Sequence, residues 1–96
     1  MLNHFGDILL DIKEQARALR LSQNLSQEGL AKRSGVSLAS LKRFEASGKI
    51  SLESLLKLAQ VLGALEDFKS LFKAKELKSL DEIIDNDKRR ERGMRK

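Results

Sequence analysis

The sequence predicts a single all-α domain, and three observations support this fold class. The 96 residues contain no Pro, Cys, Trp or Tyr and are rich in Leu, Lys, Glu and Ala, which favour helices. Apolar residues recur at intervals of three and four, the spacing of one helix face. Ser and Gly residues stand where such helices would begin and end. A chain of this length has room for one hydrophobic core.

The expected helices follow from these patterns in chain order. A first helix is predicted over about 4–22, because its apolar residues share one face. Two short helices are predicted over about 27–34 and 38–46, a fourth runs from the N-cap Ser51 to Gly63, and a fifth covers about 65–73. The residues that carry the first and last patterns are Phe5, Ile8, Leu9, Ile12, Ala16 and Leu19, and Leu65, Phe68, Leu71 and Phe72.

The composition changes beyond the fifth helix. Ser79 and Glu82 form a capping-box pattern ahead of Ile83 and Ile84, which favours a short last helix. Residues 85–96 hold one apolar residue, so they are expected to form a mobile basic tail. Its cations could contact DNA or a protein partner, or only keep the chain soluble. We therefore divide the chain into a domain, 1–73, and a partly disordered C-terminal extension, 74–96.

The charge of the chain favours a polyanionic partner. The net charge is +5, and the segment 26–50 carries five basic residues against two acidic ones. The absence of Cys excludes disulfides and thiolate metal sites, and no apolar run approaches the ~20 residues that span a bilayer. We expect a cytoplasmic protein that contacts no membrane and has no metal or other cofactor. With one His and no phosphate-binding glycine loop, we expect no enzymatic activity.

The most informative segment is LSQEGLAKRSGVSLASLKRFE, residues 25–45. Ser26 and Ser37 are good N-caps for two short helices, and Gly35 stands at the turn between them. Two helices joined by a short turn that contains Gly have the geometry of a DNA-binding helix-turn-helix, although a plain helical hairpin in a bundle has the same spacing.

From about 5 to 72 the chain resembles the Xre family of transcriptional regulators, which includes the phage Cro and CI repressors. Polar, glycine and apolar positions agree in register: Arg20, Leu25, Ser26, Gln27, Leu30, Ala31, Gly35, Val36, Ser37, Leu41, Glu45, Leu55, Leu58, Ala59, Leu62 and Gly63. The resemblance implies a compact five-helix Cro/CI-like domain that binds DNA and dimerises. It also implies a structural salt bridge between Arg20 and Glu45, against the alternative of two unrelated surface charges.

The second short helix of this unit is the expected recognition helix. We predict base contacts from Arg43 to guanine, from Leu38 and Ala39 to thymine methyl groups, and from Ser40 to base or phosphate. Family members often place glutamines at the positions of Leu38 and Ala39, so adenine contacts through side-chain amides are not expected there.

Phosphate contacts are expected around the recognition helix. The resemblance implies one from Gln27, which could instead only cap its helix, and Ser37 could act as both cap and phosphate ligand. Two further phosphate contacts are expected from Lys42 and Lys49.

The predicted partners follow from the resemblance. We expect a homodimer on a pseudo-palindromic operator. Its interface is assigned to Leu65, Phe68, Leu71 and Phe72, extended by Phe5, Ile8 and Leu9, because these apolar residues exceed what a five-helix core of this size must bury. The run from Ser47 to Leu80 is similar to HipB-like antitoxins, which repress their own operon and bind a HipA-type kinase toxin. The alternatives are a phage or housekeeping regulator without a toxin, and a protein-interaction adaptor that does not bind DNA.

Overall fold

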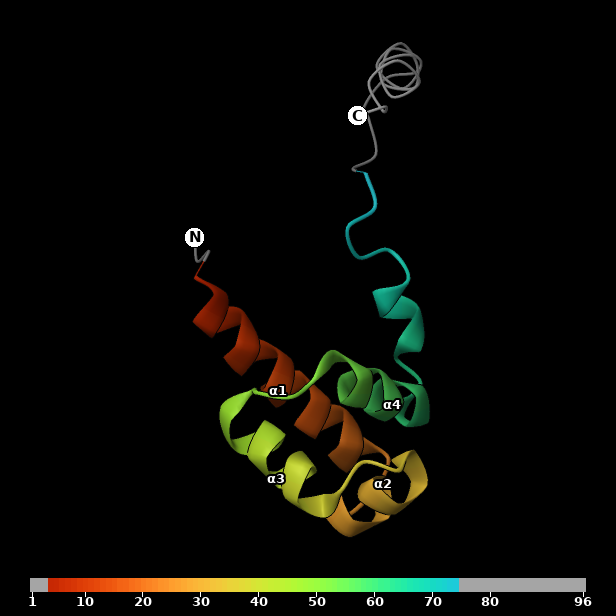
Figure 1. Cartoon of the computed structure of the whole chain (residues 1–96). Coiled ribbons are helices and arrows are strands. Elements are labelled where there is room, and N and C mark those ends of the chain that lie inside the picture. Colours follow the sequence, from red (N-terminus) through yellow and green to blue (C-terminus); the bar gives the residue numbers. More distant parts are fainter. Residues whose placement is uncertain (1–3, 75–96) are drawn as a thin grey trace, which may run out of the picture.

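The computed structural model describes residues 4–74, and within this range the chain forms helices and no strand. The all-α prediction is confirmed, and the first four helices agree with their predicted bounds to within a residue or two. The predicted last helix and basic tail lie outside the described residues. The elements are α1 (Phe5–Ser22), α2 (Gln27–Ser34), α3 (Leu38–Ser47), α4 (Leu52–Leu62) and the short 3-10 helix η1 (Leu65–Phe68), as Figure 1 shows.

Serine side chains begin three of the four α-helices. The hydroxyl oxygens of Ser26, Ser37 and Ser51 each accept a hydrogen bond from the backbone N–H three residues later, at 2.9, 3.1 and 3.1 Å. Each cap satisfies one of the N–H groups that a helix start leaves without a partner. The N-caps predicted at these serines are confirmed.

Two glycines set the path of the chain around α3. Gly35 ends α2 with a φ of 80°, in the left-handed region that favours glycine, and a Cβ there would meet no atom within 4 Å. Gly48 ends α3 at a φ of 83°, and a Cβ there would lie only 2.7 Å from the backbone oxygen of Leu9. Gly35 is therefore needed for its backbone conformation, whereas Gly48 also allows α3 to approach α1 closely.

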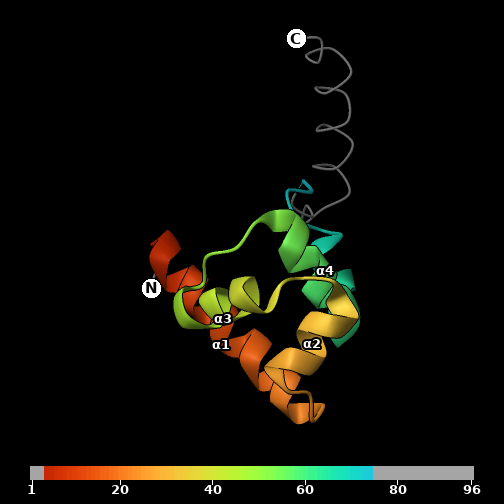
Figure 2. The ribbon, with the colours of Figure 1, turned by 60° about the horizontal axis from the view of Figure 1, so that its bottom comes forward.

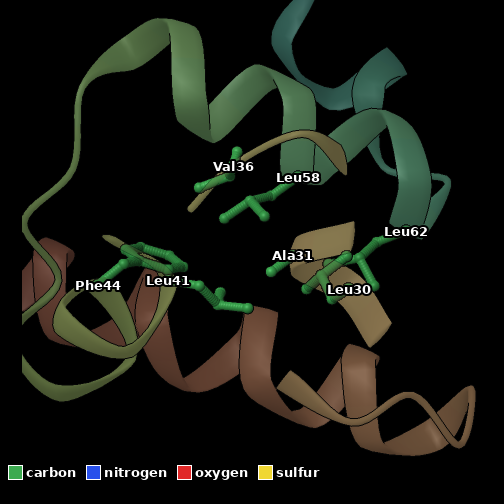
Figure 3. Close-up of a cluster of buried hydrophobic side chains, with 7 residues drawn as sticks. All are labelled: Leu30, Ala31, Val36, Leu41, Phe44, Leu58 and Leu62. Carbon is green, nitrogen blue, oxygen red and sulfur yellow. The ribbon is translucent and has the colours of Figure 1, made fainter. Parts of the chain in front are cut away.

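One hydrophobic core joins α2, the following turn, α3 and α4, as Figure 3 shows. Leu30, Leu41 and Phe44 are almost completely buried, with Phe44 on the side of α3 and Leu30 beside Leu62 on the opposite side. α1 covers this core through Ala16 and Leu19. The buried residues of the cluster are Leu30, Ala31, Val36, Leu41, Phe44, Leu58 and Leu62.

The helices pack so that α1 supports the helix-turn-helix unit from behind. α1 contacts α3 and α4, and α2 contacts the same two helices from the other side. Figures 1 and 2 show that the first half of α1 projects beyond the remaining helices. The side chain of Gln23 ties the end of α1 to the end of α4 by donating to the carbonyl of Leu62 at 2.9 Å. None of the described helices is long and apolar enough to cross a membrane.

The predicted fifth helix over 65–73 is not confirmed. The chain forms only the four-residue η1, followed by turns in which Lys69 and Leu71 donate to carbonyls three residues back. Phe72 then has a φ of 64°, which cannot continue a right-handed helix. Of the four apolar residues on which the prediction rested, three are exposed, so little burial is available to stabilise so short a helix.

Candidate DNA-binding surface

The turn between α2 and α3 is anchored to the core. Its Gly35 N–H donates to the carbonyl of Ala31 at 2.9 Å, and the Val36 N–H donates to the hydroxyl oxygen of Ser34 at 3.1 Å. Val36 itself is buried beside the other core residues. The angle between α2 and α3 is therefore held by backbone hydrogen bonds and by burial of the turn.

The outer face of α3 carries four of the residues predicted to contact DNA. Ala39, Ser40, Lys42 and Arg43 are all exposed, while Leu41 and Phe44 point into the core. This division follows from the helical period, which separates the two groups onto opposite sides of one rigid rod. Figure 2 shows α3 lying across the front of the domain in the view from below.

Leu38 differs from the other predicted base contacts. It is half-buried and packs against the hydrophobic core at the first turn of α3. Only part of its side chain is therefore accessible to a ligand. Its apolar character has a packing reason, which sequence alone did not reveal.

A buried ion pair joins α1 to the end of α3. Arg20 Nε donates to Glu45 Oε2 at 2.7 Å, and Arg20 Nη2 donates to Glu45 Oε1 at 2.9 Å. Arg20 is 6% exposed and Glu45 is 8% exposed. Such a two-point contact between a guanidinium and a carboxylate sets both distance and orientation, so it holds the recognition helix against α1.

Gln27 is a third member of this network. Its Nε2 donates to Glu45 Oε1 at 2.9 Å, and Arg20 Nη1 donates to the carbonyl of Leu25 at 2.8 Å. The amide of Gln27, predicted to contact phosphate, is thus turned inward to the carboxylate. One amide hydrogen remains for a second acceptor, while the backbone N–H of Gln27 stands at the start of α2. The sequence placed Gln27 at the right helix start but did not indicate its bond to Glu45.

The network determines the protonation of its charged members. Burial favours the neutral form of Glu45, but hydrogen bonds from Arg20 and Gln27 and the positive charges of Arg20 and Arg17 outweigh it and lower the pKa of this carboxyl. The hydrogen bond to Glu45 raises the pKa of the Arg20 guanidinium against the opposing effect of burial. Both groups are therefore charged at neutral pH.

A polar depression of about 270 Å³ lies between α3 and the start of α4. Arg43 and Ser40 line it from α3, and Lys49 lines it from the connecting turn. Ser51 and Ser54 complete it at the N-terminus of α4, where free backbone N–H groups and the helix dipole favour an anion. The sequence predicted a phosphate contact from Lys49 but did not indicate Ser51 or Ser54 as possible ligands. The S-x-x-S pattern directly after a basic turn was the available signal.

Two other predicted phosphate ligands, Ser37 and Lys42, lie outside the lining of this depression. Ser37 is exposed, and its oxygen accepts from the N–H of Ser40, so its hydroxyl hydrogen stays available. Lys42 is exposed on α3 but does not line the depression. The structure therefore groups Arg43 with Lys49 and leaves Lys42 on a separate part of the helix.

The residues predicted to form a dimer interface lie apart from this surface. Phe68 lines an apolar groove between α1 and α4, and Leu65, Leu71 and Phe72 are exposed. Because the fifth helix is absent, these four residues do not share one helix face. Leu9 was also expected at the interface, but it lies against Gly48 in the contact between α1 and α3. Among residues 4–74, no group of His, Cys, Asp and Glu side chains could hold a metal ion.

Comparison with known proteins agrees with this geometry. A family model described as Helix-turn-helix matches residues 17–68, which is more than half of the chain and includes the whole of α2, α3 and α4. No curated protein and no solved structure shows significant similarity to the chain. The matched range contains α2, the turn at Gly35 and α3. The chain therefore belongs to the Xre/Cro-CI type of helix-turn-helix family, whose members are DNA-binding transcription regulators.

Proposed function

We propose that this protein is a transcriptional repressor that binds a pseudo-palindromic operator as a homodimer. The observation that carries the proposal is that the exposed face of α3 bears Lys42 and Arg43, and that Arg43 also lines the depression with Lys49 at the start of α4. In a dimer, two such surfaces would occupy successive major grooves about 34 Å apart.

The proposed base contacts come from the exposed part of α3. Arg43 has five N–H donors and fits the O6 and N7 acceptors of guanine, and Ala39 with the accessible part of Leu38 fits thymine methyl groups. Ser40 contacts base or phosphate. The operator should therefore be recognised through its guanine and thymine bases, and not through contacts between side-chain amides and adenine.

Arg43 can be tested against its rival role as a phosphate ligand, since it also lines the polar depression. Arg43→Ala should weaken operator binding by about 1–3 kcal/mol and leave binding to random DNA much less affected. Arg43→Lys should keep the charge but lose the two-point guanine contact, and so should also lose specificity. Lys57→Ala, which removes an exposed cation of α4, is the control. Equal weakening on operator and random DNA would assign Arg43 to phosphate.

The proposed phosphate contacts come from Lys42, Lys49, Ser37 and the start of α2 at Gln27. Each lysine that neutralises one phosphate should contribute about 0.9 to the slope of log affinity against log salt. Lys49→Ala should therefore weaken operator and random DNA alike and reduce that slope by about one. A change confined to the operator would contradict this assignment.

Half-burial of Leu38 bears on the adaptor alternative. That alternative rested on apolar residues at positions that contact bases, and the packing of Leu38 on the core supplies a structural reason for one of them. DNA binding is thus the better supported function. A mobility-shift assay with the upstream region of the gene tests it: a specific shift that weakens as salt rises supports the repressor, and no specific shift supports the adaptor.

We assign the regulator to an operon with a HipA-type kinase, as its autoregulating antitoxin. The support is the HipB-like pattern from Ser47 to Leu80. A kinase-like reading frame directly downstream, whose product co-purifies with this protein, would support the assignment. A gene neighbourhood without such a kinase would favour a phage or housekeeping regulator.

A further inference from the structure

An apolar groove of about 260 Å³ runs between α1 and α4, and it shares no lining residue with the polar depression. Ile12 and Ala16 line it from α1, Leu55 lines it from α4, and Phe68 lines it from η1. Asp67, the residue before Phe68, also lines it and is exposed. We call this feature the α1–α4 groove.

The apolar wall of the groove continues along the projecting half of α1. Phe5 and Ile8 precede Ile12 by seven and four residues, so all three lie on the same helix face. Phe5 is 72% exposed, and Ile8 is about half exposed. This face is only partly covered, and it is continuous with the one that α1 buries against the core through Ala16 and Leu19.

Residues 69–74, the C-terminal arm, begin beside the groove but leave it. Leu71 is about half exposed, and Phe72 is fully exposed at 103%. The φ of 64° at Phe72 is unusual for an aromatic residue and turns the chain away from the line of η1. Figure 1 shows the arm and the projecting half of α1 on the same side of the molecule, opposite α2.

The apolar surface exposed on this face is as large as the largest patch of a typical monomer, and such a patch often has a function. With about 200 Å² for a fully exposed large apolar side chain, Phe5, Ile8, Ile12, Leu71 and Phe72 together expose roughly 600 Å². The largest apolar patch of a typical monomer is about 300–600 Å². Two copies of this patch, together with the groove walls, reach the ~1,200 Å² at which stable protein interfaces begin.

We propose that the occupant of the groove is a second copy of this chain, and that the two copies exchange their arms. Leu71 and Phe72 of each copy enter the α1–α4 groove of the other, with Phe72 against Ile12 and Leu55. Each copy carries one arm and one groove on the same side, so a two-fold axis forms both contacts at once. Lys73 follows Phe72, and its positive charge complements the negative charge of Asp67, which lines the groove.

This inference rests on the proposed homodimer and adds the surface that receives the arm. The sequence prediction treated Phe68 and Phe72 as parts of one stripe. In the exchange they belong to different surfaces: Phe68 to the receiving groove and Phe72 to the inserted arm. The helix-turn-helix unit stays free, because α2 lies at the opposite end of the domain (Figure 1).

Cross-linking tests the exchange directly, because the chain contains no Cys. Ile12→Cys protein is mixed with a tagged Phe72→Cys protein and oxidised. The expected product is a mixed disulfide dimer that forms well above the level of a control pair with Lys57→Cys, which is exposed on α4. A mixed product no more abundant than the control would overturn the proposal. The proposal would also be overturned if a chain with both Ile12→Cys and Phe72→Cys formed only an intramolecular disulfide, since the arm would then lie in the groove of its own chain.

Dimer stability gives a second readout. Phe72→Ala removes one buried anchor from each half of the interface, so it should raise the Kd of the dimer about a hundredfold or more, as measured by light scattering over a dilution series. The melting temperature of the Phe72→Ala monomer should not be lower than that of the wild-type monomer, because Phe72 makes no buried contact within one chain. The matched control is Leu21→Ala, which truncates an exposed leucine at the other end of α1 and should leave the Kd unchanged.

The same proteins separate this inference from the proposed function. A wild-type protein that is monomeric at micromolar concentration but still shifts its operator would reject the exchange and retain DNA binding. A wild-type protein that dimerises but shows no operator shift, together with cysteine variants that form the mixed disulfide, would retain the exchange and reject the repressor.

Discussion

Replacing Glu45 by Gln should destabilise the domain far more than the loss of a surface charge would. Three N–H groups converge on the two carboxylate oxygens of Glu45: Arg20 Nε at 2.7 Å, Arg20 Nη2 at 2.9 Å and Gln27 Nε2 at 2.9 Å. A glutamine has the same shape but only one acceptor oxygen, so its NH₂ group must face one of these donors. The substitution therefore leaves the buried guanidinium of Arg20 without a counter-charge and with a mismatched hydrogen bond.

The size of the effect follows from burial. The side chains of Arg20 and Glu45 are 7% and 6% exposed, so water cannot replace the lost partner. Removing one member of a buried ion pair costs about 3–5 kcal/mol, and we expect about 3 kcal/mol for Glu45→Gln. For a domain with a total stability of about 5–15 kcal/mol, this is a large fraction.

Urea unfolding followed by circular dichroism measures this loss, with Glu53→Gln as the control. Glu53 also pairs with a cation, Lys57 at 3.5 Å, but its side chain is 81% exposed, so its loss should cost less than about 0.5 kcal/mol. Replacing Arg20 and Glu45 together by Met should cost less than the sum of the two single changes, because no unpaired charge is left. A loss below about 1 kcal/mol for Glu45→Gln, or strict additivity of the pair, would refute this reasoning.

Three further predictions follow from the same structure. Because folding lowers the pKa of Glu45, the contribution of its carboxylate to the free energy of unfolding is complete above the ordinary Glu pKa of about 4.3 and declines as the pH falls. Urea titrations should therefore show the free energies of unfolding of wild type and Glu45→Gln converging in acid. Gly48→Ala should lower the free energy of unfolding by about 3 kcal/mol, measured by thermal unfolding, because its Cβ would meet the Leu9 carbonyl. Gly35→Ala should lower it by only ~1 kcal/mol, the cost of a positive φ for alanine. Equal losses for the two variants would contradict this. Ser54→Ala should weaken operator and random DNA a few-fold alike in fluorescence titrations without changing the salt slope, since the lost ligand is neutral; an unchanged affinity would remove Ser54 from the site.

Local signals were enough to place the first four helices. Each of α2, α3 and α4 has a serine N-cap, a glycine in the left-handed conformation after its last turn, and an apolar face at helical spacing. These features act within a few residues of one another, so they can be recognised along the chain. The prediction of a fifth helix was wrong because it also rested on a local signal. The apolar spacing over 65–73 is present, but no surface of the folded domain buries this segment as a helix.

The candidate site depended on contacts that the linear sequence does not display. The inward turn of Gln27, the half-burial of Leu38 and the convergence of Lys49 with Ser54 all join residues from different elements. Whether an amide contacts phosphate or a carboxylate depends on which acceptor the packing of α1 and α3 brings near it. The pairing of Arg20 with Glu45 was expected only from the family resemblance, since nothing in their local sequence links two residues 25 positions apart.

By itself the sequence determined the helix class, the caps, the turn at Gly35 and the basic character of the segment proposed to contact DNA. These properties depend on backbone conformation and on charge, and both are set locally. Only the tertiary structure decided which polar side chains are held in a buried network, which hydroxyls line the depression beside Arg43, and which apolar residues remain uncovered around Phe72. Those outcomes depend on how α1, α3 and α4 pack, because burial and the low dielectric of the interior exist only once the helices are assembled.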